Sequence, residues 1–167
     1  MPINVDDLTV PFDTGARGTL LEDWQWLLGS RRWLIGRRRR LPILVCALGD
    51  AFVQDVDDGS VHLLDTGAGV LERVADSAEA FRGLLRQPDF VASNFRSSAA
   101  AELRDGGRVL APGQVWGFIH PPALGGTYRV DNYEPTDMVV HFSIQGQIHQ
   151  QIKDLPPGTS ISSIKLR

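Results

Sequence analysis

The fold is decided by residues 41–74, which read LPILVCALGDAFVQDVDDGSVHLLDTGAGVLERV. Residues 43–48 form a short, continuous apolar run, a pattern typical of a strand that is covered on both faces. Three further short strands are expected, at residues 51–56, 61–64 and 70–74. The segments between them, 57–60 and 65–69, contain the Asp and Gly residues that tolerate the positive φ of tight turns. Short strands joined in this way pair with their sequence neighbours, so the stretch predicts an antiparallel β-meander.

Helical patterns follow the meander. Asp76 or Ser77 is a suitable N-cap for a helix, which Pro88 then ends, and residues 90–103 continue with helical spacing up to Gly106. After a short strand at residues 115–119, a long helix is predicted for residues 138–154, with Thr136 or Asp137 as its cap. A meander followed by helices predicts an α+β fold, with the helices packed on one face of the sheet.

The first 40 residues contain one predicted helix and a basic stretch. Thr19 and Glu22 have the spacing of a capping box, and an apolar stripe runs from Leu20 to Leu28. Arginines follow at positions 31, 32 and 37–40, and we interpret this stretch as a solvated connector. We therefore expect one domain over residues 1–167: an N-terminal helix and connector (1–40), an α+β core (41–157) and a tail (158–167).

Composition excludes several classes of protein. Apolar residues make up 43% and charged residues 22% of the 167 residues, as in globular rather than disordered chains. No apolar run approaches the roughly 20 residues that span a bilayer, and the N-terminus lacks the order of a signal peptide. The single cysteine, Cys46, excludes an internal disulfide. We expect a cytoplasmic protein without a membrane partner.

The charge is unevenly distributed along the chain. Residues 41–105 contain 11 acidic and 5 basic residues, whereas residues 1–40 contain 5 acidic and 7 basic residues. Four aspartates lie at the turns of the meander and are our candidates for contact with a basic protein partner: Asp55, Asp57, Asp58 and Asp65. An ordinary solvated acidic surface is the alternative interpretation of the same charges.

No catalytic or metal-binding constellation is recognisable. Cys46 lies in an apolar run, where a thiol is usually buried and inert. The loop that begins at Asp55 has Thr66 where a calcium loop needs a bidentate Glu. His141 and His149 would lie about 12 Å apart along a helix, too far to share one metal ion. We therefore expect no metal, no cofactor and no catalytic residue.

Two other functions stay open on the sequence. One is a small enzyme with an unrecognised acid–base pair, for which Asp50, Asp131 and His149 are the candidates. The other is weak nucleic-acid binding through Arg37–Arg40, although nucleic-acid sites usually add a wider basic face and placed aromatics.

Several motifs, in order along the chain, suggest a family. They are ALGDAF (47–52), Phe81 in the helix after the meander, PPALGGTY (121–128), VDNYE (130–134) and SIQGQIHQQIKDLP (143–156). Over residues 41–157 the chain resembles the C-terminal domain of type VI secretion immunity proteins, once a domain of unknown function, and is loosely similar to SMI1/KNR4-type bacterial immunity domains. The resemblance implies an α+β domain without catalytic residues that binds and neutralises a toxin carried by the same cell.

Glycines in these motifs are explained by backbone geometry. We expect Gly49, Gly125 and Gly126 to form turns and Gly146 to allow close helix packing. Together, the residues and the resemblance predict a non-enzymatic protein that binds and neutralises a cognate toxin. If that toxin is a nuclease with a basic DNA-binding cleft, an acidic face of this protein could occupy the cleft by mimicking phosphate charge.

Overall fold

The computed structural model describes residues 4–13, 17–29 and 39–167. Five strands form an antiparallel sheet in the order β1-β2-β3-β4-β5. Their bounds are β1 Thr9–Val10, β2 Arg40–Cys46, β3 Ala51–Asp55, β4 Val61–Asp65 and β5 Val70–Ala75. Two more strands, β6 Gln114–Phe118 and β7 Tyr133–Asp137, pair in a small second sheet. The predicted meander and the α+β class are confirmed.

Helical segments occur before and after the large sheet. The α-helices are α1 Arg17–Leu20, α2 Gln25–Leu28, α3 Ala78–Leu84, α4 Pro88–Asn94, α5 Ser97–Asp105 and α6 Met138–Ile152. Short 3-10 turns occur at η1 Val5–Leu8, η3 Glu22–Trp24, η4 Pro122–Leu124 and η5 Val130–Asn132. The predicted caps hold: Ser77 accepts a hydrogen bond from the N–H of Ala80, and Asp137 accepts one from the N–H of Val140.

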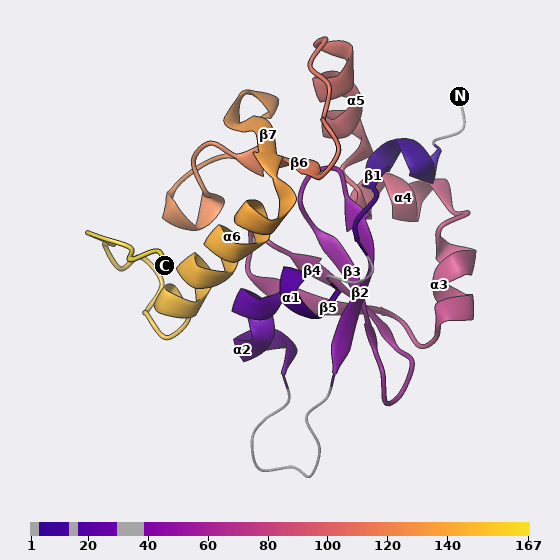
Figure 1. Cartoon of the computed structure of the whole chain (residues 1–167), viewed down its shortest axis with the longest axis horizontal. Coiled ribbons are helices and arrows are strands. Elements are labelled where there is room, and N and C mark those ends of the chain that lie inside the picture. The colour runs from indigo at the N-terminus through magenta and orange to yellow at the C-terminus, as the bar shows by residue number, and fades with distance from the viewer. Residues whose placement is uncertain (1–3, 14–16, 30–38) are drawn as a thin grey trace.

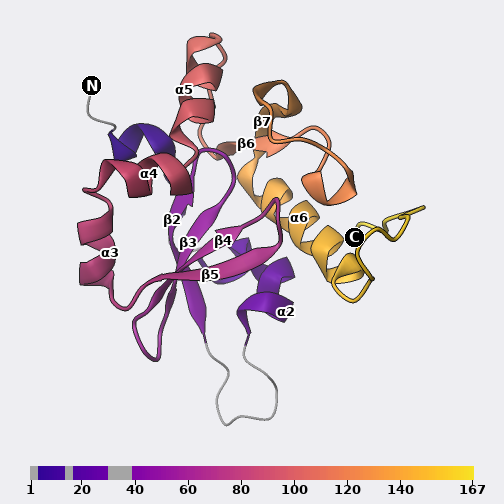
Figure 2. The same ribbon diagram turned by 180° about the vertical axis from the view of Figure 1, so that it is seen from behind.

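Helices cover both faces of the large sheet, not one face as the sequence led us to expect. Phe52 of β3 packs on the side of α3, α4 and α5, whereas its neighbours Ala51 and Val53 pack on the side of α2 and α6. Figures 1 and 2 show these two helical layers from opposite sides. The physical reason is that β3 and β4 are apolar at successive positions, and successive side chains of a strand point to opposite faces.

The N-terminal segment differs from its prediction. The helix begins at Arg17 rather than at Leu20, so Thr19 lies inside α1 and is not an N-cap. The backbone then leaves helical geometry at Leu21 and continues through η3 into α2. This segment packs on α6, where the indole Nε1 of Trp24 donates a 2.9 Å hydrogen bond to the carbonyl of Phe142. A side chain at Gly146 would collide with the backbone of Asp23, which confirms the close helix packing expected there.

The small sheet was only half predicted. Strand β6 lies where a strand was expected, but β7, which pairs with it in antiparallel register, was not. The N–H of Trp116 in β6 donates a 2.7 Å hydrogen bond to the carbonyl of Ala47, at the end of β2. The second sheet is thereby attached to the same end of the large sheet as the turns that follow β2 and β4.

Candidate functional site

One end of the large sheet is built from two turns, residues 47–50 between β2 and β3 and residues 66–69 between β4 and β5. Helix α6 lies against both turns through its two histidines. His141 Nε2 donates a 2.9 Å hydrogen bond to the carbonyl of Gly49, and His149 Nε2 donates a 3.0 Å bond to the carbonyl of Thr66. A carbonyl only accepts, so each ring carries its proton on Nε2. The histidine row expected on the last helix is therefore structural and anchors the helix to the turns.

Glycines make this contact possible. Gly49 and Gly69 have φ of +83° and +68°, and each lies directly against a histidine ring, His141 and His149 respectively. A Cβ at either position would overlap the ring. The turn role predicted for Gly49 is confirmed, with close approach to a side chain as a second reason for glycine. Gly125, at φ +97°, and Gly126, which lies against the carbonyl of His120, confirm the predicted turn after η4.

Arg96 connects this end of the sheet to the rest of the molecule. Its Nη2 lies 3.0 Å from an oxygen of Asp65 and 3.6 Å from an oxygen of Asp50. Its Nη1 donates a 3.3 Å hydrogen bond to the hydroxyl of Tyr133, and its Cζ lies 4.4 Å from the centre of the Tyr128 ring. Among the described residues, Arg96 is the one non-glycine with positive φ, at 49°. This strained backbone places its guanidinium between two carboxylates and two aromatic rings.

Burial shifts the protonation of the groups around Arg96. Asp50 is buried and accepts hydrogen bonds from the N–H and hydroxyl of Thr66, and burial raises its pKa to about 6, against the opposing effect of Arg96. Burial lowers the pKa of His141 to about 4, so that its ring is neutral at pH 7. Burial also raises the pKa of Tyr128. The cluster therefore holds its charge on Arg96 and its carboxylate partners, while the histidines stay neutral.

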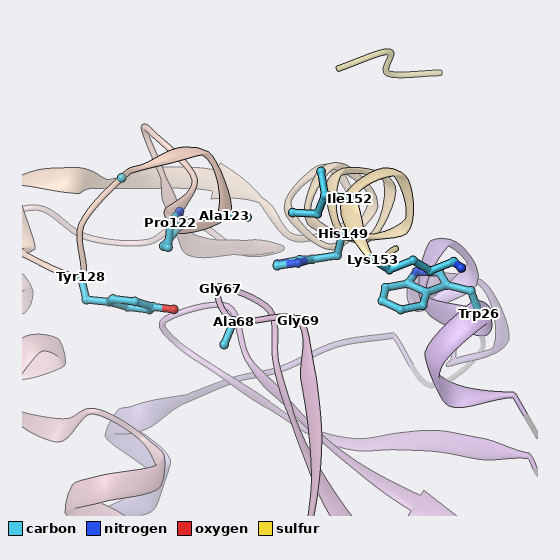
Figure 3. Close-up of a pocket in the computed structure, with 11 residues that line it drawn as sticks. Trp26, Gly67, Ala68, Gly69, Pro122, Ala123, Tyr128, His149, Ile152 and Lys153 are labelled. Atoms are coloured by element: carbon cyan, nitrogen blue, oxygen red, sulfur yellow. The ribbon is translucent and has the colours of Figure 1, made fainter. Parts of the chain in front are cut away.

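A cleft of about 630 Å³ opens beside this cluster. Tyr128 forms one side and Trp26 the other, with His149 and the turn at Gly67–Gly69 between them (Figure 3). The remaining lining residues come from η4, the loop after it and the end of α6: Pro122, Ala123, Gly126, Ile152 and Lys153. The cleft thus has aromatic walls, a backbone-lined floor and one lysine.

The four aspartates predicted as a contact surface do not lie together. Asp57 and Asp58 are exposed at the hairpin between β3 and β4, whereas Asp65 lies at the opposite end of β4 and pairs with Arg96. Asp55 is fully buried, accepts a 2.9 Å hydrogen bond from the N–H of Asp57 and lies 3.5 Å from Arg40. The two ends of β4 are about 13 Å apart at the usual rise of a strand. Asp57 and Asp58 are therefore the two of the four that share one surface.

The basic stretch is only partly within the described residues, since positions 30–38 lie outside them. Arg40 is not part of a solvated connector. It begins β2, its Nη1 donates a 3.0 Å hydrogen bond to the carbonyl of Leu28, and its Nε faces the carboxylate of Asp55. The positive charge of Arg40 is therefore paired inside the fold, because the buried carboxylate of Asp55 needs a cation beside it.

The three candidates for an acid–base pair do not assemble into a site. Asp50 and His149 are buried and bound to Thr66, while Asp131 is exposed on η5 and pairs with Arg129. No hydrogen bond or ion pair within the described ranges joins Asp131 to the other two. Cys46 is buried, and burial raises the pKa of its thiol well above its usual value, as expected for an inert cysteine.

Two further properties concern only the part of the chain that the structure describes. Within it, no group of three or more His, Cys, Asp or Glu residues is placed to hold a metal ion. None of its helices is both long enough and apolar enough to cross a bilayer.

One segment of the chain, which holds Arg96, Tyr128 and the two histidines, matches a known protein family. Residues 75–149 match the family of the type VI secretion system immunity protein Tdi1, C-terminal. The resemblance to a type VI secretion immunity domain is confirmed. A search of curated proteins finds no match.

The Tdi1-type segment, residues 75–149, is narrower than the 41–157 expected. It contains α3, α4, α5, β6, β7 and most of α6, whereas β1 to β4 precede it. Asp50 and Asp65 therefore lie outside the Tdi1-type segment, and Arg96, Tyr128 and His141 lie inside it. The Arg96 cluster and the cleft both form where the two parts of the chain meet.

The sequence did not point to Arg96 or to Trp26. Arg96 lies 31 residues from Asp65 and 37 from Tyr133 along the chain. The local feature that distinguishes Arg96 is its position between α4 and α5, where the helical pattern that we expected over residues 90–103 is interrupted. Tyr128 and Tyr133 lie in two of the motifs that suggested the family, but nothing in their spacing indicated a shared arginine.

Proposed function

We propose that this protein is an immunity protein that binds and neutralises a cognate bacterial toxin, without catalysis, in the cytoplasm of the cell that makes the toxin. The observation that carries this proposal is the match of residues 75–149 to the Tdi1 C-terminal family of type VI secretion immunity proteins. An inhibitor of this kind needs a complementary surface and no reacting groups. The lack of an assembled acid–base pair among Asp50, Asp131 and His149 in the described structure is consistent with this role.

We further propose that the toxin is a nuclease and that an acidic surface of this protein enters its basic substrate cleft. That surface is the acidic tip, defined as Asp57, Asp58 and Asp76. Asp76 belongs to it because Arg73 bridges the two segments, with Nη1 3.8 Å from Asp58 and Nη2 2.9 Å from Asp76. The tip thus holds three carboxylates and one guanidinium, which contacts two of them, so the tip is acidic as a whole. Such a tip offers a basic cleft the charge that phosphates would supply.

Asp55 supports the acidic tip from inside and does not belong to its surface. Its Oδ1 accepts hydrogen bonds from the N–H groups of Asp57 and Asp58, which fixes the hairpin that presents their carboxylates. Pre-organised charges lose less entropy on binding than flexible ones.

The test is co-purification with the product of the adjacent gene, produced as a catalytically inactive variant, together with a growth-protection assay against the active toxin. Binding and protection are expected. The double variant Asp57→Asn, Asp58→Asn should bind more slowly and with a weaker dependence on salt. Asp105→Asn with Asp131→Asn is the matched control, because it removes two exposed carboxylates elsewhere. No binding and no protection by the unaltered protein would remove the proposed function.

A further inference from the structure

The cleft between Tyr128 and Trp26 lies at the end of the large sheet opposite the acidic tip, and its chemistry is different. We propose that it is a second contact site for the same toxin, and that it receives a short toxin segment that carries a carboxylate beside an apolar or aromatic side chain. The inference rests on the proposed function and adds a named surface and a named ligand chemistry to it.

The walls of the cleft are held in place by contacts within the fold. The guanidinium of Arg96 lies on the Tyr128 ring and is held in turn by Asp50 and Asp65. His149 is held by its hydrogen bond to Thr66 and lies against the ring of Trp24, which stacks on Trp26. Aromatic walls held in this way are typical of the anchor pockets in protein interfaces, because they bury large areas at a low entropic cost.

Apolar surface is available in the cleft on both sides. Tyr128 is 43% exposed although it contacts Arg96 and Phe118, and Trp26 is half-buried. Ile152, Pro122 and Ala123 add aliphatic surface between the two rings (Figure 3). A volume of about 630 Å³ is within the range of pockets that enclose a small ligand, and is large enough for two or three side chains of a partner.

The charge of the cleft selects an anionic group. None of the residues that line it in the described structure is acidic, and Lys153 is the one that carries a full charge. The lining of the cleft is thus positively charged, whereas the chain as a whole has a net charge of −3. Lys153 pairs with Asp154, which is exposed and is not one of the residues that line the cleft. A partner carboxylate can replace this exposed pairing at little cost, since such ion pairs contribute little to stability.

Two side chains in the cleft, Tyr128 and Lys153, can donate hydrogen bonds to a bound group. The hydroxyl of Tyr128 projects over Gly67 at the floor, and the ammonium of Lys153 lies at the Trp26 side (Figure 3). His149 is neutral because burial lowers its pKa, and its Nε2 proton is used by Thr66. Donors on both sides of the cleft, with aliphatic and aromatic side chains between them, match a carboxylate with an adjacent ring or aliphatic chain.

The experiment measures binding of the inactive toxin from the adjacent gene by calorimetry, with thermal unfolding of each variant as the check on folding. Ala68→Trp fills the cleft from the turn, and Lys153→Glu reverses its charge. The matched controls are Ala92→Trp on the exposed side of α4 and Lys165→Glu on the exposed tail. Each cleft variant should weaken binding by about tenfold or more, while each control stays within about twofold of the unaltered protein.

The outcomes separate the two proposals. If the unaltered protein binds the toxin and both folded cleft variants bind equally tightly, the cleft proposal is overturned and the proposed function stands. If the unaltered protein does not bind the toxin at all, both proposals fail. Loss of binding in Lys153→Glu but not in Lys165→Glu supports the anionic character of the bound segment.

Discussion

Gly69 lies against the imidazole ring of His149 with no space for a Cβ between them. This contact joins the turn after β4 to α6, although the two residues are far apart in the sequence. The same arrangement recurs at the neighbouring turn, residues 47–50, where Gly49 lies against His141. Helix α6 is therefore placed on the sheet by two histidines, each seated on a glycine of positive φ.

Gly69→Ala should destabilise the protein by about 3 kcal/mol or more, from backbone strain at positive φ and from collision with His149. Gly59→Ala is the matched control, because Gly59 has a similar φ of +75° and nothing near its absent Cβ. Gly59→Ala should lower the free energy of unfolding only by the cost of backbone strain at positive φ, about 1–2 kcal/mol. Urea unfolding of both variants measures the difference, and equal losses would show that the histidine contact is unimportant.

Arg96→Ala should destabilise the protein by about 3 kcal/mol, because it leaves the buried carboxylate of Asp50 without its cation. The loss should be smaller in an Asp50→Asn background, since the buried charge is then already absent. A double-mutant cycle by urea unfolding measures this coupling. Arg129→Ala, which removes an exposed partner of Asp131, serves as the control and should change stability little. Additive losses in the cycle would contradict the pairing.

Asp50 should make the protein less stable as the pH rises from 4 to 7. Its pKa is raised in the folded state from 3.8 to about 6, so the folded state binds the proton more tightly than the unfolded chain. The stability from this group is fully present below pH 3.8 and is lost as the pH passes 6, by about 3 kcal/mol in total. The free energy of unfolding of Asp50→Asn, minus that of the unaltered protein, should therefore increase across this range. A constant difference would argue against the raised pKa.

His141 should have the opposite effect. The pKa of His141 is lowered from 6.5 to about 4. Between these two pH values the imidazole is protonated in the unfolded chain but neutral in the folded state. Its contribution is fully present above pH 6.5 and is lost as the pH falls through 4, by about 3 kcal/mol. In urea unfolding between pH 4 and 7.5, His141→Gln should be less sensitive to acid than the unaltered protein. The two variants, Asp50→Asn and His141→Gln, should thus change the pH profile in opposite directions, and a shift of the same sign in both would refute the assignment.

Local patterns were sufficient to predict much of the fold. The Asp and Gly residues at 57–60 and 65–69 placed the turns, and Ser77 and Asp137 placed two helix starts, because each acts on its own neighbouring backbone. Strand β7 was missed because its sequence, YEPTD, has little intrinsic preference for a strand. It is a strand because β6 pairs with it.

The candidate site was much less predictable. The grouping of Asp57 and Asp58 with Asp65 failed because the strand between the two turns, β4 Val61–Asp65, places them at opposite ends of the sheet, which the strand predicted at residues 61–64 already implied. Asp55, predicted for the surface, is buried because its carboxylate holds the hairpin and faces Arg40.

The sequence by itself determined the strands of the meander, their turns, the caps at Ser77 and Asp137 and the resemblance to an immunity family, since these depend on residues a few positions apart. Only the tertiary structure decided which helices cover each face of the sheet, that Arg96 joins Asp50 and Asp65 to two tyrosines, and that a cleft forms between Tyr128 and Trp26. These features arise from the packing of segments 30 to 100 residues apart, as in the contact of His141 with Gly49. Such packing depends on the total free energy of the folded chain, and no local pattern encodes it.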